Sequence, residues 1–200
     1  MTGSLSVKRV TGQALHHYLD EVARLRIAVF REFPYLYDGD LDYERRYLQT
    51  YVDCPQAVVV LALDGSEVVG ASTGIPMAFE EDNFRLPLVQ AGYDPRRVFY
   101  CAESVLDKAY RGQGLGVRFF AEREAHAAEL GGFDYCCFCA VSRAQDDPRR
   151  PAAYEPLDRF WEKRGYRKHP AMIARYRWKD VGEQEQTSKD LEFWVKSVTT

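Results

Sequence analysis

The chain has 200 residues, enough for one compact domain with a sizeable core and too few for a second domain of normal size. Its 27 basic and 30 acidic side chains leave a net charge of -3, which disfavours a general nucleic-acid binder because phosphate contacts need a basic surface. No window approaches the ~18 apolar residues of a membrane span, and the N-terminus lacks the apolar core of a signal peptide. We therefore expect a cytoplasmic protein that binds neither nucleic acid nor membranes.

Five cysteines are present, an odd number, and three of them crowd together as Cys136, Cys137 and Cys139. Neighbouring residues on a strand point to opposite faces, and no Cys-x-x-Cys pair or histidine partner lies nearby. We expect these residues to be small, buried, reduced side chains and predict no metal site.

Hydropathy patterns predict the elements of the first 80 residues. Apolar residues alternate with polar ones in the first strand and recur at helical spacing in the two helices, and Asp-Gly marks a hairpin turn. The predicted elements are a strand over 5–11, a helix from Leu15 to about Phe33, a helix over 41–52 with Asp40 as N-cap, and two strands over 57–63 and 67–77.

The second half begins with an irregular segment, 80–98, which we interpret as an insertion containing a short helix. The apolar patterns that follow predict further elements in this order: a strand over 98–106, a helix over 112–131 with Val117, Phe120, Ala121, Ala125 and Ala128 facing inward, a strand over 133–141 buried on both faces, a charged loop over 142–156, a short helix over 157–164 closed by Gly165, and strands over 171–179 and 190–198.

This order of elements predicts an α/β domain whose sheet has mixed strand direction. The final strand carries Leu191, Phe193, Trp194 and Val195. It is apolar enough either to complete its own sheet or to pair across a homodimer interface, so a homodimer is possible.

The most informative segment is Arg111-Gly112-Gln113-Gly114-Leu115-Gly116, which follows a predicted strand and opens a predicted helix. Glycines let the backbone approach a ligand, and the free N–H groups at a helix start bind phosphate. Arg111 adds a charge that pairs well with phosphate oxygens. The sequence therefore predicts a phosphate-binding loop.

Two common phosphate loops fit this segment poorly. The dinucleotide fingerprint Gly-x-Gly-x-x-Gly would need a glycine where Val117 stands, and a nucleoside-triphosphate loop would need Gly-Lys-Ser/Thr.

The spacing Arg-x-x-Gly-x-Gly resembles the acetyl-CoA pyrophosphate loop of the GNAT superfamily of N-acetyltransferases. The element order is similar from about residue 5 to 198, and the segment 160–166, Phe-Trp-Glu-Lys-Arg-Gly-Tyr, looks like the family's fourth helix and its exit. The resemblance implies a single acyl-CoA N-acyltransferase domain over 1–200. It also implies a GNAT-like mixed, mostly antiparallel sheet of six to seven strands with flanking helices and a splayed central pair of parallel strands.

The resemblance also assigns the cofactor contacts. Backbone N–H groups from Gln113 to Val117 hold the pyrophosphate with Arg111 alongside, in the loop that also contains Gly112, Gly114, Leu115 and Gly116. Val105 and Leu106 pair their backbone with pantetheine opposite the strand over 133–141. A backbone N–H of the strand before the loop polarises the acetyl carbonyl.

In the family the amine attacks the thioester directly. The resemblance makes Glu103 a candidate base, acting directly or through water; a solvated or salt-bridged strand carboxylate is the alternative. The departing thiolate often takes a proton from a tyrosine in the fourth helix, but Trp161 stands there in this sequence. Tyr154 is a candidate substitute, and release without a dedicated acid is the other possibility.

The acceptor stays open at this point. The segment 35–44 combines aromatic rings with carboxylates, which suits a cationic amine, while helix capping explains Asp40, Asp42 and Glu44 without a ligand. Conversely, the insertion over 80–98 and the loop that carries Arg143, Arg149 and Arg150 offer positive charge to an acidic substrate.

We predict an N-acetyltransferase that moves acetyl from acetyl-CoA to a primary amine of a small molecule in a ternary complex. A non-catalytic acyl-CoA-binding sensor or scaffold is one alternative, which Trp161 keeps open. A protein N-terminal or lysine acetyltransferase is another. It would favour an open acceptor groove, whereas the insertion over 80–98 suggests a covered one.

Overall fold

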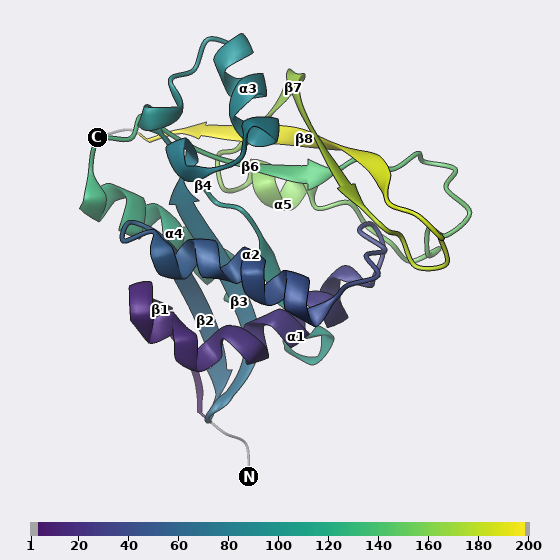
Figure 1. Ribbon diagram of the computed structural model, residues 1–200, viewed down its shortest axis with the longest axis horizontal. Helices are drawn as coiled ribbons and strands as arrows, with labels where there is room; N and C mark the ends of the chain where they lie inside the picture. The colour runs from purple at the N-terminus through teal and green to yellow at the C-terminus, as the bar shows by residue number, and fades with distance from the viewer. Residues whose placement is uncertain (1–3, 199–200) are drawn as a thin grey trace.

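The computed structural model describes residues 4–198, which build one eight-stranded sheet between two layers of helices (Figure 1). Neighbouring strands run antiparallel except for the parallel pair β4 and β6. The strands, in their order across the sheet, are β1 (Leu5–Val10), β2 (Val58–Asp64), β3 (Glu67–Pro76), β4 (Val98–Tyr100), β6 (Tyr135–Val141), β8 (Thr187–Ser197) and β7 (Arg167–Trp178), and β5 (Ser104–Leu106) pairs with β3. The predicted mixed, mostly antiparallel sheet is confirmed, with eight strands instead of six to seven.

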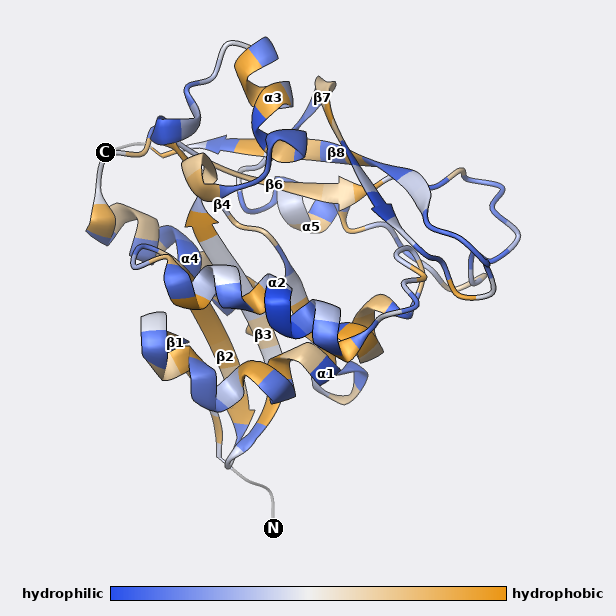
Figure 2. Cartoon of the chain, in the orientation of Figure 1, coloured by the Kyte–Doolittle hydropathy of each residue, from blue (hydrophilic) through white to orange (hydrophobic). Residues whose placement is uncertain are grey.

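Helices cover both faces of this sheet. Two clusters of buried residues lie on either side of β2, since Val59 and Leu61 face one cluster while Val58 and Val60 face the other. Figure 2 shows β2 as an almost continuous hydrophobic run, as expected for a strand buried on both faces. The helices are α1 (Leu19–Phe30) and α2 (Leu41–Asp53) on the first face, α4 (Leu115–Leu130) and α5 (Asp158–Glu162) on the second, and α3 (Asp82–Gln90) beside β7.

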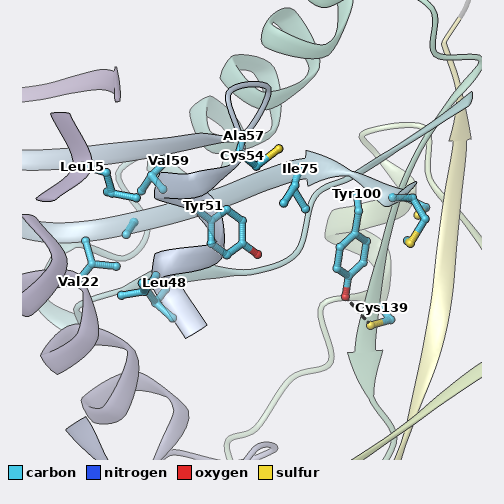
Figure 3. Packing of buried hydrophobic residues seen from close by; sticks show 14 of the residues in the cluster. Leu15, Val22, Leu48, Tyr51, Cys54, Ala57, Val59, Ile75, Tyr100 and Cys139 are labelled. Atoms are coloured by element: carbon cyan, nitrogen blue, oxygen red, sulfur yellow. Dashed lines mark hydrogen bonds between the residues drawn. The ribbon is translucent and has the colours of Figure 1, made fainter. Parts of the chain in front are cut away.

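The core under α1 and α2 continues up to the site. In Figure 3, Val22 of α1 and Leu48 and Tyr51 of α2 point toward β2 and β3, and all three are buried. Farther along, the Tyr100 hydroxyl lies 2.9 Å from Cys139 Sγ and so ties β4 to β6. Large apolar side chains thus fix where α2 lies above the sheet.

The predicted limits of two helices are wrong. Residues Gly12–Tyr18 form a 3-10 helix before α1, and α1 ends at Phe30 because the chain turns back there, with the Tyr37 N–H donating to the Phe30 carbonyl at 2.8 Å. The helix after the glycine loop begins at Leu115, three residues later than expected, because Gly112 and Gly114 adopt positive φ angles of 79° and 80°.

Of the five residues expected on the inward face of α4, only Phe120 is buried. Val117 is 42% exposed, and Ala121 and Ala128 are exposed too. The face that is buried consists of Leu115, Phe119, Phe120, Arg123 and Ala127. A hydropathy pattern cannot predict this face, because it contains an arginine. Arg123 is only 1% exposed, and its guanidinium donates to buried carbonyl groups that only the structure reveals.

The strand predicted over 98–106 is in fact two strands. β4 ends at Tyr100 and β5 begins at Ser104, and the three residues between them leave the regular ladder. The Cys101 N–H still donates to Cys137 of β6 at 2.7 Å, whereas the Glu103 carbonyl accepts from Thr73 of β3 at 3.0 Å. The chain therefore changes partner within this break.

The remaining expectations concern the insertion and the last strand. The short helix predicted within 80–98 is α3, which packs against β7. The last strand, β8, lies between β6 and β7, so it completes its own sheet and has no free edge for a second copy. Within residues 4–198, no helix is both long and apolar enough to cross a membrane.

Candidate active site

The central parallel strands separate beyond the first three residue pairs. β4 pairs with β6 from Val98 opposite Tyr135 to Tyr100 opposite Cys137. Beyond this point β5 pairs with β3 alone, with Val105 opposite Ala71. The splayed central pair that the family resemblance implied is therefore present.

Alternation along β5 decides which backbone groups face this opening. Thr73 N–H donates to the Glu103 carbonyl, and Asp107 N–H donates to the Val69 carbonyl at 2.9 Å. In an antiparallel ladder every second residue bonds the same neighbour, so Val105 directs its backbone groups to β3. Ser104 and Leu106 direct theirs away from β3. Of the two residues named from the sequence, Leu106 fits the opening and Val105 does not, and Ser104 was missed.

The glycine loop presents free amides at the start of α4. The Val117 N–H already donates to the Gly114 carbonyl at 3.0 Å. Within residues 4–198, the amides of Gln113, Gly114, Leu115 and Gly116 have no protein acceptor. Val117 therefore drops out of the expected set of pyrophosphate-binding amides. The other four lie at the positive end of the helix dipole.

Space in front of these amides is open. A Cβ atom added to Gly112 or Gly114 would meet nothing within 4 Å, while one added to Gly116 would lie 3.2 Å from the Phe160 ring. Gly116 thus lets α5 pack closely against α4, and the other two glycines leave room for a ligand.

Arg111 lies beside this loop, as expected, but it has protein partners. Its Nη1 lies 2.9 Å from Glu32 Oε2 and its Nε donates to the Leu106 carbonyl at 3.2 Å. Both charged side chains of this pair are more than 40% exposed. An exposed ion pair of this kind contributes about 0–1 kcal/mol, so a phosphate can displace Glu32 at little cost.

The two aromatic residues considered for the leaving thiolate have different surroundings. Trp161 packs edge-on against Phe138 and Trp194, with ring centroids 5.0 and 5.1 Å away, and serves as a core residue. Tyr154 is half-buried and packs edge-on against Phe33 at 4.7 Å. Burial raises the pKa of Tyr154, so its hydroxyl keeps its proton at neutral pH.

A cavity of about 640 Å³ lies on the α1–α2 side of the break between β4 and β5. Its wall is mainly aromatic and acidic. The aromatic part comprises Phe30, Tyr35, Tyr37, Tyr43, Tyr47, Phe84, Tyr100, Tyr176 and Trp178, and the carboxylates are Asp38, Asp40, Glu44, Glu80, Glu81 and Glu103. Four cationic side chains, Arg26, Arg46, Arg177 and Lys179, also line it, so acidic groups outnumber basic ones. The hydroxyls of Tyr43 and Tyr176 are hydrogen-bonded to each other, which links α2 to β7. Such a wall suits a cation.

Glu103 lies in this cavity with a side chain only 10% exposed. One of its carboxylate oxygens pairs with Arg26 of α1, and the other accepts a hydrogen bond from the Tyr47 hydroxyl at 2.8 Å. Glu103 was expected either as a base or as a salt-bridged carboxylate. The ion pair with Arg26 agrees with the salt-bridged carboxylate, and the position of Glu103 in the cavity wall is the one that a base requires.

Arg26 also pairs with Glu44, which is fully buried. The other oxygen of Glu44, Oε1, has no hydrogen-bond partner within residues 4–198. Helix capping explains Asp40, whose carboxylate accepts from the Tyr43 N–H at 2.8 Å, but it does not explain Glu44. One guanidinium therefore balances two carboxylates inside the molecule.

Glu80 adds a third carboxylate to this wall, from the segment between β3 and α3. No side chain in the described part of the chain donates a hydrogen bond to it. Burial and the nearby Glu103 raise the pKa of Glu80 to about 7. Burial is the larger of the two causes, and the charge of Glu103 adds to it, so the carboxyl group of Glu80 holds a proton up to near neutral pH.

The positive charge expected from the loop over 142–156 is not available to this cavity. Arg143 and Arg149 both pair with buried Asp180 at 2.8 Å, and Arg150 lies over the Tyr154 ring. The insertion over 80–98 likewise contributes carboxylates and Phe84 to the wall. The expectation of a basic surface for an acidic substrate is wrong, because these arginines hold the loop together.

The cysteines around the cavity have no metal-binding partners. Within residues 4–198, no three His, Cys, Asp or Glu side chains are grouped to hold a metal ion. Cys139 lines the cavity, and burial raises the pKa of its thiol to about 12. A thiol held protonated in this way is a poor nucleophile.

Comparison with known proteins places this geometry in a family. The family model described as "Acetyltransferase (GNAT) family" matches residues 20–166. The chain belongs to the GNAT acetyltransferase family. No curated protein sequence matches this GNAT protein significantly.

Solved structures share the fold over nearly the whole length. Arabidopsis thaliana NAA60 in complex with acetyl-CoA is 13% identical, with a TM-score of 0.60, and the match covers 98% of this GNAT chain and 99% of that one. YncA from Salmonella typhimurium with its cofactor acetyl-CoA is 13% identical, with coverages of 98% and 94% and a TM-score of 0.61. Ribosomal-protein-alanine N-acetyltransferase from Brucella melitensis is 14% identical, with coverages of 96% and 99% and a TM-score of 0.62.

Replacing Glu80 by glutamine is expected to change how the stability of this GNAT protein depends on pH. A carboxyl group whose pKa rises from 4.5 to about 7 on folding destabilises the folded protein progressively between those two pH values. Removing this group should stabilise the variant relative to wild type by about 1–3 kcal/mol at pH 8 and hardly at all at pH 4.5. Urea unfolding of both proteins from pH 4.5 to 8 measures the difference; a constant difference contradicts the expectation.

Proposed function

We propose that this protein transfers an acetyl group from acetyl-CoA to a primary amine of a small molecule, by direct attack in a ternary complex. The observation that carries the proposal is the opening between β5 and β6. The glycine loop that follows β5 offers free amides, and the aromatic and acidic cavity lies beside the break that precedes β5. A donor site and an acceptor site thus border the same opening. The five free, buried cysteines are in keeping with a cytoplasmic location.

The donor side fits the pyrophosphate of acetyl-CoA. Four amides at the start of α4 lack acceptors, Arg111 stands next to them, and the positions of Gly112 and Gly114 are open. Backbone amides and a helix dipole favour phosphate oxygens. The two relatives whose structures carry acetyl-CoA share this fold, which supports the same donor here.

The acceptor side fits a small amine that arrives as a cation. The cavity is of the size that small ligands occupy, and its aromatic rings and carboxylates attract an ammonium group. The segment between β3 and β4 contributes Glu80, Glu81 and Phe84 to its wall, which supports a covered site. A protein N-terminus is the competing acceptor, because the Brucella relative is named for such a substrate.

The chemistry requires one bond to form and one to break. The neutral amine attacks the thioester carbon, the N–C bond forms, the C–S bond breaks, and CoA leaves as a thiolate. Backbone amides of β5 that face away from β3, those of Ser104 and Leu106, are placed to polarise the carbonyl oxygen. The negative charge of Glu103 stabilises the positive charge that develops on nitrogen as the amine attacks. A carboxylate of the cavity accepts the proton directly or through water, and Glu103 is the candidate that the sequence names.

Tyr154 is proposed to protonate the leaving thiolate in place of the residue at Trp161. It retains its proton at neutral pH because burial raises the pKa of the phenol. Its ring is fixed by Phe33, at the end of the segment that follows α1 and close in sequence to the Glu32 partner of Arg111.

The first test is thermal unfolding with acetyl-CoA, with NADH and ATP as controls. A ligand present at about a hundred times its dissociation constant should add about 2.7 kcal/mol, which is a rise of roughly 5 °C or more for a chain of this size. A rise with acetyl-CoA alone supports the donor assignment. No rise with any CoA ester contradicts it.

CoA release in the presence of small amines then tests the acceptor. We expect turnover with small primary amines and little with peptides that carry a free N-terminus. Binding of acetyl-CoA without turnover on either kind of substrate would favour a non-catalytic acyl-CoA sensor or scaffold. Turnover on peptides alone would favour a protein acetyltransferase, and a covalent acetyl-enzyme that turns over would exclude direct attack.

Gly114→Glu is expected to weaken acetyl-CoA binding at least tenfold, because it places bulk and negative charge at the anion site. Gly92→Glu is the matched control, since Gly92 also has a positive φ of 88° with open space around it but lies between α3 and β4. Isothermal titration of both variants with acetyl-CoA compares them. Equal affinities would show that the loop is only a turn.

Tyr154→Phe is expected to lower kcat about tenfold or more while the KM for acetyl-CoA and the melting temperature stay near wild type, because the ring keeps its contact with Phe33. Tyr93→Phe is the control, a half-buried tyrosine that packs edge-on against Tyr135 at 5.0 Å and does not line the cavity. Steady-state kinetics decide. An unchanged kcat means that the thiolate leaves without a dedicated acid.

A further inference from the structure

We propose that Glu80 accepts the proton that the attacking amine releases, and that Glu103 acts as the fixed negative charge that prepares Glu80 for this role. The proposal rests on the acetyl transfer proposed above and replaces Glu103 by Glu80 as the base. Glu80 belongs to the segment between β3 and α3, and no sequence motif points to it.

Glu103 is poorly suited to accept a proton because both of its oxygens are engaged. One oxygen pairs with Arg26 and the other accepts from Tyr47. Protonating Glu103 would weaken a buried ion pair, and breaking such a pair is costly. Arg26 is itself only 7% exposed and cannot turn to water for compensation. Protonation of Glu103 would therefore disrupt contacts that Glu80 does not make.

Glu80 has the opposite surroundings. It lines the same cavity, and no side chain in the described part of the chain donates to its carboxylate or pairs with it. Apart from the amide of Glu81, no group of the described chain holds its oxygens, which leaves acceptor capacity for a guest. Protonation of Glu80 breaks no ion pair and relieves its repulsion with Glu103. Glu80 is therefore the carboxylate of this cavity at which a proton binds most favourably.

The cavity wall also carries four cations, Arg26 of α1, Arg46 of α2, Arg177 of β7 and Lys179. Arg26 pairs with Glu44 and Glu103, and Lys179 pairs with Asp38. The titratable groups that interact most strongly with Glu80 are negative or neutral at pH 7. They are Tyr47 and Tyr51 of α2, Tyr100 of β4, Glu103 in the break before β5, Cys137 and Cys139 of β6, Tyr176 of β7, and Glu81 beside it. The Glu81 amide opposes the upward shift in part, and burial and Glu103 outweigh it, which raises the pKa of Glu80 to about 7. A base works best when its pKa lies near the working pH.

The proton balance is then complete. The amine lone pair forms the N–C bond, the C–S electrons leave with sulfur, and the N–H proton passes to a Glu80 oxygen, directly or through one water. The thiolate takes a proton from Tyr154 or from solvent. The amine, which arrives as an ammonium, loses one proton to water before it attacks, and Tyr154 regains from water the proton that it gives to the thiolate. Glu80 returns to water the proton that it accepted when the products leave, so no oxidant or further reactant is needed.

The test compares the pH dependence of kcat/KM in wild type, Glu80→Gln, Glu103→Gln and Glu81→Gln, with one small amine that wild type acetylates. We expect an ascending limb near pH 7 in wild type. In Glu80→Gln the limb should vanish and the rate fall about a hundredfold. In Glu103→Gln the limb should remain but move to lower pH, because its charge no longer raises the pKa of Glu80. Glu81→Gln should keep the limb with a smaller displacement.

Two further measurements separate catalysis from folding. Glu80→Asp should keep the limb at a reduced rate, whereas a structural role for the residue would not produce this rescue. Carbon-13 NMR of glutamate carboxyl groups should show a titration near pH 7 that is absent in Glu80→Gln and moves to lower pH in Glu103→Gln. All variants should bind acetyl-CoA as tightly as wild type.

The outcomes are distinguishable. If Glu103→Gln loses the limb and Glu80→Gln keeps it, Glu103 is the base and this inference is overturned while the acetyltransferase stands. If Glu80 does not titrate near pH 7, the inference is overturned as well. A wild-type protein that acetylates no amine overturns the proposed function itself, and the inference with it.

Discussion

The guanidinium of Arg123 fixes the place where the sheet opens. It reaches from α4 into the interior and donates to the carbonyls of Thr73 at 3.3 Å and Glu103 at 3.1 Å. These carbonyls belong to β3 and to the break between β4 and β5, where regular pairing to β6 has stopped. A buried carbonyl without a donor is costly. Arg123 satisfies the Thr73 carbonyl and adds a donor to the Glu103 carbonyl, which already accepts from the Thr73 N–H, so a buried cation ties α4 to the break. The start of the same helix carries the free amides of the glycine loop.

A second buried guanidinium organises the other side of the break. Arg26 pairs with Glu44 and Glu103, and the Tyr47 ring lies 4.3 Å from it. Six carboxylates and four cationic side chains line the cavity, which leaves it negative, and around Arg26 one guanidinium stands against Glu44 and Glu103. The excess falls on Glu80, which has no partner of its own among the described residues. The pKa of Glu80 thus depends on its own burial and on Glu103, which Arg26 of α1 and Tyr47 of α2 hold in place.

How far the sequence predicts this molecule depends on whether a feature is local. The strands, the N-cap at Asp40 and the glycine loop are local, because period and glycine spacing specify them directly. The buried face of α4 is not, since Arg123 belongs to it only because distant carbonyls receive its protons. The sequence does not predict Glu80 as a site residue either. Its segment has no regular hydropathy pattern, and its role depends on Glu103, 23 residues away in the chain.

The same distinction separates the two halves of the proposed reaction. Donor recognition uses backbone amides, which residues of almost any type can supply where glycines allow the required backbone conformation. A short motif such as that around Gly114 is therefore enough. Acceptor recognition uses side chains from α1, α2, β4, β7 and the segment before α3, which meet only in the folded chain. An amine entering this cavity meets negative charge first and must lose its proton there. Glu80 is the carboxylate that can take this proton without disturbing an ion pair. It lies on the irregular segment between β3 and α3, whereas Glu44 and Glu103 already pair with Arg26.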